Sequence, residues 1–393
     1  MLPIIQRDLP QSFVVEKLTN EASEESKKLL DPVIINGNNL TLEKIIAVAR
    51  FHQPAQLSQD PEIMKSMEAS VNVIEDIVSQ SLPLYGVTSL FGGLANNLIS
   101  REAAEELQNN LVRVHNTGAG AMMPLESIRA AMLLRANTHM IGASGIRRLW
   151  DERIIRFLNE GVTPLVPEFG SIGASGDLVP LSYIAAALSG QDERIRVDFK
   201  GQLISATDAL EKLGLKPQRY NPKEGLAILN GTSVMTASAS LASYDFYTLM
   251  AAAIQIHAMA FQALNASNQP LNPFLHKVKS HKGQVGTHGN PLFFLTINRT
   301  LFQIDSADIL LKSIENSSMI YDALDGKLTK RSAEALIQDR YSLRCSPQYI
   351  GPLIESMHEI ARVLEIEMNS ANDNPLIDGE NKKVYCEYAL QFL

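Results

Sequence analysis

Residues 173–176 read Gly-Ala-Ser-Gly, and these residue types in this order can form an electrophile from the chain itself. In a tight bend, the Gly176 nitrogen can attack the carbonyl carbon of Ala174. One water then leaves the new ring, and a second leaves the Ser175 side chain. The product is a 4-methylidene-imidazol-5-one, an electrophile that no ordinary side chain provides. Because glycine permits the compressed backbone that ring closure requires, the segment predicts electrophilic chemistry on an amine with no metal and no dissociable cofactor.

The same four residue types occur a second time, at Gly142–Gly145. The flanking residues there fit a helical pattern, and we expect one continuous helix from Leu125 to Leu158. A helix would hold the glycine nitrogen away from the alanine carbonyl. The later copy instead follows a glycine-rich approach and precedes Asp177, which can start a helix. The sequence therefore favours the later copy as the reactive one.

Three other segments could serve this chemistry if they converge on Ser175. Tyr85 opens a glycine-rich loop at 86–93, and loops of this kind can close over a site. A phenol, with a reference pKa near ~10, would need an electropositive setting to act as a base, and a purely structural turn tyrosine is the alternative. Asn230 precedes a glycine and a predicted helix, so it could cap that helix or offer its amide to a bound amine or to the ring oxygen.

The third segment holds Tyr341 and Arg344, which are close enough in sequence to share one face of a helical turn. The guanidinium beside the hydroxyl could grip a carboxylate with two parallel hydrogen bonds, and a surface ion pair is the alternative. Other chemistries have weaker support. His281 and His288 have no companion Cys or acidic residue at metal spacing, so we expect no zinc site. No nucleophile elbow, phosphate loop or dinucleotide fingerprint occurs in the sequence.

The elements that must position these residues are mostly helices. A short strand at Val33–Ile35 and a hairpin that turns at Lys200-Gly201 accompany them. The spacing of apolar residues predicts helices at 58–81, 101–114, 125–158, 205–214, 234–265, 306–320 and 352–369. We therefore expect a mainly α chain with a small α+β N-terminal region. Its expected divisions are a polar leader at 1–32, an N-terminal domain at 33–232, a helical segment at 233–385 and a tail at 386–393.

Composition limits the class of protein. Of the 393 residues, 45% are hydrophobic and 20% charged, and the formal net charge is -8. Such a chain can bury a large core, and its acidic balance argues against nucleic acid or an anionic membrane as the partner and favours a small molecule. Only two cysteines and no secretory signal predict a cytoplasmic protein without a disulfide framework. The apolar stretch 234–264 is interrupted by polar residues, which suits a buried helix better than a membrane span.

Four motifs together resemble the aromatic amino acid ammonia-lyase family, which includes the histidine, phenylalanine and tyrosine ammonia-lyases and related aminomutases. The likeness runs from about Val33 to Tyr385, and the residues along it look similar to those of cyanobacterial phenylalanine ammonia-lyases. The motifs are Gly-Ser-Ile-Gly-Ala-Ser-Gly-Asp-Leu at 170–178, Leu-Asn-Gly-Thr at 229–232, Gln-Asp-Arg-Tyr-Ser-Leu-Arg-Cys at 338–345 and Asn-Ser-Ala-Asn-Asp-Asn-Pro at 369–375.

The resemblance implies a mainly helical bundle that assembles as a homotetramer, with each site drawing residues from three subunits. It implies that Ala174, Ser175 and Gly176 form the prosthetic group and that the substrate amine adds to the methylene carbon derived from Ser175. Tyr85 would take the β-proton, and loss of ammonia would leave a trans-arylacrylate. The other implied site residues are Asn230, Gln338 and Tyr341, which steady the adduct, Arg344, which holds the carboxylate, and Val114, His115 and Leu226, which line the ring pocket.

The identity of the aromatic ring is less determined. The family's selectivity pair corresponds to Val114-His115, and a histidine at the second position resembles the histidine ammonia-lyases. Leu90-Phe91, in contrast, resembles the cyanobacterial phenylalanine enzymes. A histidine in the pocket could hydrogen-bond a phenol or an imidazole, or only fill space. We expect phenylalanine or tyrosine ahead of histidine, with an aminomutase reaction as the alternative.

Two regions depart from the family pattern. The likeness lapses over 285–304, and after Tyr385 the residues at 386–393 no longer follow the family, so we expect a bundle that is incomplete at its C-terminus. Two hypotheses follow. The chain is an enzyme that deaminates an aromatic amino acid, weak or inactive on its own, or it is a non-catalytic remnant that at most binds a partner.

Overall fold

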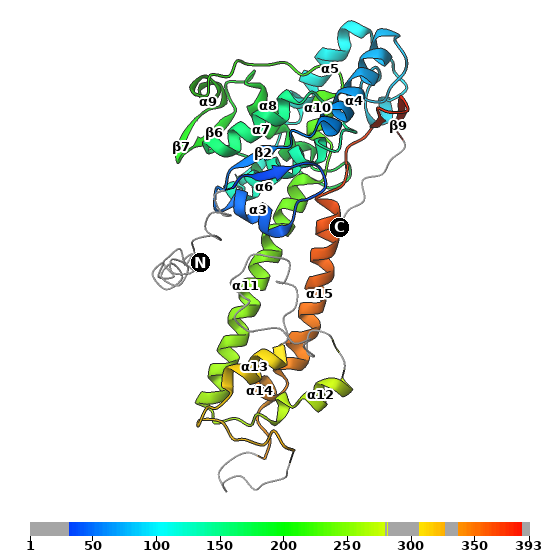
Figure 1. The fold of residues 1–393 in the computed structure, drawn as a ribbon. Helices are drawn as coiled ribbons and strands as arrows, with labels where there is room; N and C mark the ends of the chain where they lie inside the picture. The colour runs from blue at the N-terminus through cyan, green and yellow to red at the C-terminus, as the bar shows by residue number, and fades with distance from the viewer. Residues whose placement is uncertain (1–30, 280, 282–305, 327–336, 387–393) are drawn as a thin grey trace. The chain divides into compact units, whose positions relative to one another are not determined.

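The computed structural model describes residues 31–279, 281, 306–326 and 337–386, which Figure 1 draws as a coloured ribbon. The described residues divide into two compact units, residues 31–40, 44–237 and 368–386 in the first and mainly the described residues of 238–367 in the second. The predicted polar leader lies almost wholly outside the described residues. We treat each unit by itself. The divergent segment 285–304, His288 and the tail beyond Cys386 lie outside the described residues.

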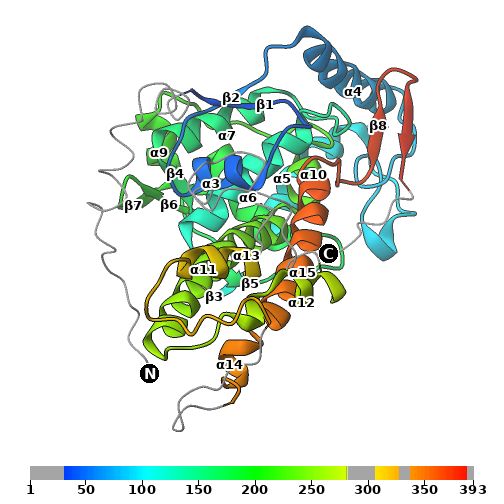
Figure 2. The same ribbon diagram turned by 60° about the horizontal axis from the view of Figure 1, so that its bottom comes forward.

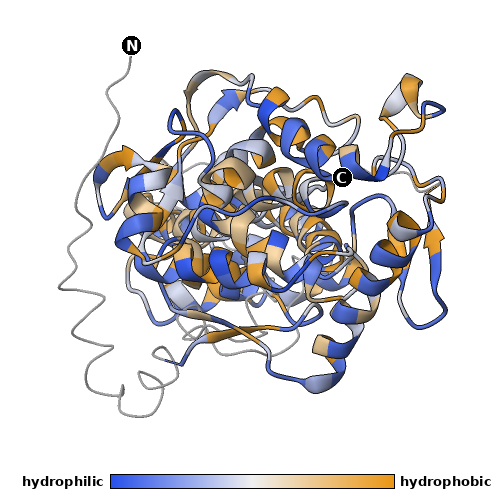
Figure 3. Ribbon diagram, turned by 90° about the horizontal axis from the view of Figure 1, so that it is seen from above, coloured by the Kyte–Doolittle hydropathy of each residue, from blue (hydrophilic) through white to orange (hydrophobic). Residues whose placement is uncertain are grey.

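The first unit contains most of the helices. They are α3 (Leu42–Ala49), α4 (Pro61–Ser79), α5 (Arg101–Val114), α6 (Leu125–His139), α7 (Leu149–Glu160), α8 (Leu178–Ser189), α9 (Ala206–Lys212) and α10 (Glu224–Leu229), with a short 3₁₀ helix η1 (Gly92–Leu94). In Figure 3 hydrophobic and hydrophilic residues alternate along the ribbon of the helices, as expected where one helix face is buried and the other exposed.

Four small sheets accompany these helices. β1 (Val33–Ile35) pairs parallel with β2 (Ala55–Leu57), and β3 (Ala119–Met122) pairs antiparallel with β5 (Pro167–Phe169). β6 (Arg196–Phe199) lies between β4 (Val162–Pro164) and β7 (Gln202–Ser205), antiparallel to both. β8 (Leu376–Asp378) pairs antiparallel with β9 (Lys383–Tyr385), and Figure 2 shows this hairpin near α4. The predicted strand at 33–35 and the predicted hairpin at 200–201 are confirmed.

The helix α6 forms the centre of the first unit, because its residues 127–139 are all buried. Its buried Arg129 donates to the backbone carbonyls of Val48 at 2.8 Å, Ala49 at 3.1 Å and Leu158 at 3.2 Å. These carbonyls belong to the last turns of α3 and α7, where a helix offers them no internal partner. One side chain of α6 therefore completes the C-terminal ends of two neighbouring helices.

The predicted continuous helix from Leu125 to Leu158 is wrong. The structure ends α6 at His139 and begins α7 at Leu149. Gly142 and Gly145 have φ angles of 84° and 62°, a left-handed conformation that a right-handed helix cannot contain. The earlier Gly-Ala-Ser-Gly copy therefore lies in a loop, not within a helix.

Other helix boundaries test the sequence pattern in detail. The prediction for α5 is confirmed at both ends, and the Ser100 hydroxyl accepts the Ala103 N–H at 3.3 Å as its N-terminal cap. α13 (Ser306–Ile314) ends earlier than the predicted residue 320. α15 (Ser346–Glu367) begins earlier than the predicted residue 352. Proline suits the first turn of a helix, which led to that prediction, but Pro352 here lies inside the helix.

The second unit is built on two long helices, α11 (Ser233–Ala263) and α15, with η2 (Gln269–Leu271), α12 (Pro273–Val278), α13 and α14 (Tyr341–Arg344). α11 and α15 lie side by side in Figures 1 and 2. The Tyr247 ring stacks on His358 at 5.9 Å, and His257 Nε2 lies 2.7 Å from the Tyr349 hydroxyl. Within the part of the chain that the structure describes, no helix is both long and apolar enough to cross a bilayer.

The boundary between the units differs from the predicted division at residues 232 and 233. Contacts divide the chain after Ala237 and return 368–386 to the first unit, although the sequence pattern groups these residues with the second. The cause is a set of buried polar contacts. Asn137 Nδ2, for example, donates to the Met368 carbonyl at 2.9 Å and to Asn369 Oδ1 at 3.2 Å.

Candidate functional site

Residues 173–176 form the tight bend that ring closure requires. Gly173 and Gly176 both have a φ angle of 72°, and backbone bridges join Gly173 to Gly176 and Ala174 to Gly176. A Cβ atom at Gly176 would lie 2.3 Å from the Gly231 carbonyl oxygen, so only glycine fits at this position. The bend therefore holds Gly176 next to Ala174, the arrangement that ring closure would require.

Asn230 holds Ser175 directly. Its Nδ2 donates to the Ser175 carbonyl oxygen at 2.8 Å and to the Ser175 hydroxyl at 3.2 Å. Its Oδ1 accepts the Asn374 N–H at 2.9 Å. Although Asn230 directly follows α10, its side chain is committed to Ser175 and Asn374. Asn374 is a contributor to the site that we did not single out from the sequence.

Asp177 anchors the bend to a different helix from the one it precedes. Its carboxylate accepts the N–H groups of Val234 at 2.9 Å and Met235 at 2.8 Å, in the first turn of α11, and the Ser171 hydroxyl at 2.8 Å. A carboxylate is favourable there because the first N–H groups of a helix lack internal partners. Burial raises the pKa of Asp177 above its ordinary value, and these hydrogen bonds oppose that rise.

The earlier copy at 142–145 lacks the features of the reactive bend. Ser144 is 1% exposed and its hydroxyl donates to Asp373 Oδ1 at 2.9 Å, whereas Ser175 is exposed. The Ala143 carbonyl accepts the Ile377 N–H at 2.9 Å. A serine that is buried in this way, in a segment bound to β8, has no access for a substrate. The two copies are therefore distinguished by burial and by partners.

The Tyr85 loop is fixed on both sides of the tyrosine. Leu84 and Val87 are buried in one apolar cluster with Ile377 and residues of α4, while the Tyr85 side chain is half-buried. The Tyr85 hydroxyl accepts the Gly92 N–H at 3.3 Å. The phenol is therefore carried on an anchored turn.

Gln108 joins this loop to α10. Its Nε2 donates to the Gly86 carbonyl at 2.8 Å, and its Oε1 accepts the Leu226 N–H at 2.9 Å. A Cβ atom at Gly86 would lie 2.8 Å from Leu226 Cδ2, so the loop backbone lies against the Leu226 side chain. Leu226 and Asn230 are one helical turn apart, which places them on the same side of α10. The sequence signal for Gln108 was a polar residue in the apolar stripe of α5.

We predict that Gln108→Leu lowers the free energy of unfolding by about 2–4 kcal/mol, because two buried backbone groups lose their only described partner. Thermal or denaturant unfolding measures this loss. Gln108→Glu is the control. It can accept the Leu226 N–H but cannot donate to Gly86, so it should show an intermediate loss. An unchanged stability in the leucine variant would contradict the bridging role.

Val114 and His115 end α5 near the beginning of α8. Asn116 Nδ2 donates to Ser182 Oγ in α8 at 3.1 Å, and α8 begins directly after Asp177. Val114 is 63% exposed. His115 Nδ1 lies 2.8 Å from the Leu111 carbonyl, so this nitrogen carries the proton and Nε2 is the acceptor of the neutral ring.

Gln338, Tyr341 and Arg344 belong to the second unit. The guanidinium of Arg344 lies 4.2 Å from the centre of the Tyr341 ring, so the expected shared face is confirmed. Tyr341 is 73% exposed, and Gln338 is exposed. Asp339 Oδ2 accepts the Ser267 N–H at 2.8 Å and fixes the start of this segment. The structure therefore brings Tyr341 and Arg344 together, and Gln338 precedes them in the same segment.

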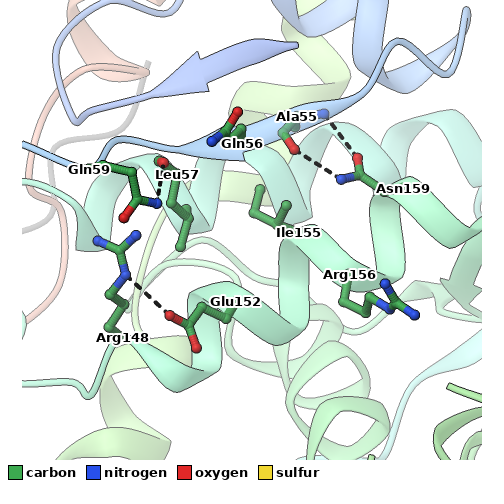
Figure 4. Close-up of a pocket in the computed structure, with 9 residues that line it drawn as sticks. All are labelled: Ala55, Gln56, Leu57, Gln59, Arg148, Glu152, Ile155, Arg156 and Asn159. Carbon is green, nitrogen blue, oxygen red and sulfur yellow. Dashed lines mark hydrogen bonds and ion pairs between the residues drawn. The ribbon is translucent and has the colours of Figure 1, made fainter. Parts of the chain in front are cut away.

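A separate surface pocket of about 280 Å³ lies between β2 and α7 (Figure 4). Several of its polar groups are already paired. The Asn159 amide bonds both the N–H and the carbonyl of Ala55 at 2.9 Å, and Arg148 pairs with Glu152 at 3.2 Å. We assign no chemistry to it. Among the described residues, no three His, Cys, Asp or Glu side chains gather as metal ligands.

Comparisons with known proteins point to one family. A model described as aromatic amino acid lyase matches residues 40–387. The chain is similar to a phenylalanine ammonia-lyase of Nostoc punctiforme, 47% identical over 90% of this chain and 58% of that protein. It is similar to a histidine ammonia-lyase of Treponema denticola, 36% identical over 90% of this chain and 63% of that protein.

A solved structure agrees with these matches. A tyrosine aminomutase from Streptomyces globisporus superposes with a TM-score of 0.79 at 31% identity, covering 92% of this chain and 65% of that one. The expected helical fold of the ammonia-lyases is therefore confirmed for the described residues. The chain spans about 60% of the length of the relatives it matches, from 58% to 63% for the two named above.

Proposed function

Because the chain belongs to the aromatic amino acid lyase family, we propose that it eliminates ammonia from an aromatic L-amino acid, phenylalanine or tyrosine, to leave a trans-arylacrylate. One observation carries the proposal. The bend at 173–176 places Ala174 against Gly176 and presents an exposed Ser175 to the amide of Asn230. An exposed serine in a bend of this kind is suited to ring formation.

The residues present fit the prosthetic group that the family uses. The space at Gly176 admits no side chain, and the Asn230 amide is already directed at Ser175. We propose that Ala174, Ser175 and Gly176 form a methylidene-imidazolone, with Asn230 as the group that holds it. When formed, this group supplies an electrophilic carbon to the substrate amine.

The other roles follow from the chemistry of each side chain. We propose that the Tyr85 phenol takes the β-proton and that Arg344 binds the substrate carboxylate through its guanidinium. Gln338 and Tyr341 would orient the same end of the substrate. Val114, His115 and Leu226 would enclose the ring, and the contact between Leu226 and the Tyr85 loop supports this grouping.

We also propose that the site is completed in a homotetramer, where residues of other copies reach the bend. The exposure of apolar side chains beside the bend supports this assembly, since Ile172 is 90% and Phe169 64% exposed. Apolar side chains that gather at the surface of a soluble protein can mark an interaction surface. A cytoplasmic setting is part of the proposal, and it agrees with Cys345 and Cys386 both being free.

Two observations bear on the substrate. The higher identity to a phenylalanine enzyme, 47% against 36% for a histidine enzyme, favours phenylalanine. The free acceptor on His115 Nε2 would also suit the phenol of tyrosine. An imidazole substrate could use the same acceptor, so the assay must include histidine.

The test is incubation of the purified chain with L-phenylalanine, L-tyrosine or L-histidine. We expect the absorbance of an arylacrylate to rise with an equal amount of ammonia for phenylalanine or tyrosine. A β-amino acid product would identify an aminomutase instead. Because a chain that is weak on its own could give no measurable product, absence of every product would contradict the lyase proposal only together with an intact mass that shows no loss of water, and that pair of results would favour a non-catalytic role.

A further inference from the structure

The segment Asn372-Asp373-Asn374 determines how the Asn230 amide is oriented. The Asn374 N–H donates to Asn230 Oδ1 at 2.9 Å, and Asn372 Nδ2 donates to Thr232 Oγ1 at 2.7 Å. A backbone N–H can only donate, so it fixes the oxygen of the Asn230 amide toward Asn374. The NH₂ group of Asn230 is then left facing Ser175, as ring formation requires.

Asp373 holds this segment through a second set of contacts. Its carboxylate accepts Lys223 Nζ at 2.7 Å and the Ser144 hydroxyl at 2.9 Å, and Arg135 Nη2 lies 3.8 Å away. The side chains of Lys223 and Asp373 are both 0% exposed. We call these two residues the Lys223–Asp373 clamp.

The loop at 142–145 surrounds the clamp. Ser144 binds Asp373, and a Cβ atom at Gly145 would lie 3.4 Å from Lys223 Cγ. Ala143 accepts the N–H of Ile377, which continues the chain beyond Asn374. The Gly-Ala-Ser-Gly copy that does not form the reactive bend therefore supports the segment that orients Asn230.

The backbone at Lys223 is strained in a way that the clamp explains. Its φ angle is 77°, in the left-handed region that a side-chain-bearing residue rarely adopts. Such a conformation persists only where the surroundings fix it, and it is common next to functional sites. Here it occurs directly before α10, the helix that ends one residue before Asn230. The Lys223 side chain is thereby directed into the interior.

We propose that Lys223 and Asp373 are positioning residues for ring closure: by fixing the 372–374 segment, they orient the Asn230 amide on Ser175. This inference rests on the proposed function. Stability alone is a weak explanation of the clamp, because replacing a buried ion pair with neutral residues is often neutral or stabilising. A fixed position is what an ion pair of 2.7 Å supplies here.

The experiment follows the intact mass of the chain at intervals after a pulse of expression, which gives the rate at which two waters are lost. In the Lys223→Met variant, the ring at 174–176 should close about tenfold more slowly than in the unaltered chain. A change of about tenfold is the effect expected from losing one oriented hydrogen bond to a reacting group. If methionine leaves Asp373 too destabilised to fold, the double variant Lys223→Met, Asp373→Asn decides, because it removes both charges. It should close equally slowly.

Arg147→Met is the matched control. Arg147 pairs with Glu224 at 2.5 Å at the same end of α10 but does not contact Asp373. It should lower the melting temperature without changing the rate of water loss. If Arg147→Met closes as slowly as Lys223→Met, the effect is general destabilisation and the inference is wrong.

The outcomes separate this inference from the proposed function. A folded Lys223→Met or double variant that closes at the rate of the unaltered chain would overturn the positioning role, while the proposed function stands. An unaltered chain that never loses two waters would remove the proposed function, and the inference with it.

Discussion

Replacement of Ser175 by alanine should abolish the two-water deficit in intact mass that we expect of the unaltered chain, because the variant can lose at most the one water of ring closure. Alanine has no hydroxyl to leave as the second water, so the methylidene carbon cannot form. We expect loss of arylacrylate formation by at least about 10³-fold, the scale on which covalent catalysts depend on their reacting group. Mass spectrometry and the ammonia assay measure the two effects separately.

Ser144→Ala is the matched control for this substitution, since the same residue types surround it. It loses one hydrogen bond to Asp373, which should cost about 1 kcal/mol of stability, but it should retain the deficit of two waters. If Ser144→Ala abolished the deficit and Ser175→Ala did not, the assignment of the reactive bend would be reversed.

Gly176→Ala should also prevent water loss, by a different physical cause. The φ angle of 72° is unfavourable for alanine, and the new Cβ would lie 2.3 Å from the Gly231 carbonyl oxygen. The backbone must shift, which moves the attacking nitrogen away from Ala174. We expect a loss of about 3 kcal/mol in unfolding free energy together with an unmodified mass.

Gly145→Ala tests whether strain alone accounts for that result. Gly145 has a φ angle of 62°, and its added Cβ would meet Cδ1 of Ile377 and Cγ1 of Ile74, both at 2.9 Å. Side-chain ends can move, so we expect a loss of about 1–2 kcal/mol with the water deficit retained. A normal mass deficit in Gly176→Ala would show that the bend tolerates a side chain and would contradict its geometry.

The helices could be predicted where apolar spacing and a capping residue agree. For α5, the apolar spacing predicted both ends correctly, and the structure adds Ser100 as the cap at its start. The break at 142–145 was missed because small residues are compatible with a close-packed helix face, and nothing local reveals a left-handed φ. At α15 the error was a helix predicted too short. Proline is common at a helix start, so the sequence predicts residue 352 as the first residue, but Pro352 lies within α15.

The residues of the candidate site likewise fall into those that a local sequence pattern indicates and those that it does not. The reactive bend is a local motif, and four adjacent residue types indicate it. Gln108 and Lys223 act through partners that are 118 and 150 residues away in the chain, so no local pattern can reveal those partners, although the place of Gln108 in the apolar stripe of α5 marks it as unusual. Asp177 suggested a cap for the helix that follows it. Its carboxylate instead caps α11, because the fold brings that helix start within 2.8 Å.

The distance in sequence between Asn230 and Asn374 determines when ring closure can be assisted during synthesis of the chain. The two residues are 144 positions apart, and synthesis at ~5–20 residues per second takes on the order of ten seconds to cover that interval. Until Asn374 has emerged, the newly made bend has no backbone donor to orient the amide beside it. A ribosome stalled before residue 374 would therefore hold a chain that carries the precursor tripeptide without an oriented Asn230 amide, and we expect ring closure to reach its full rate only after residue 374 has emerged.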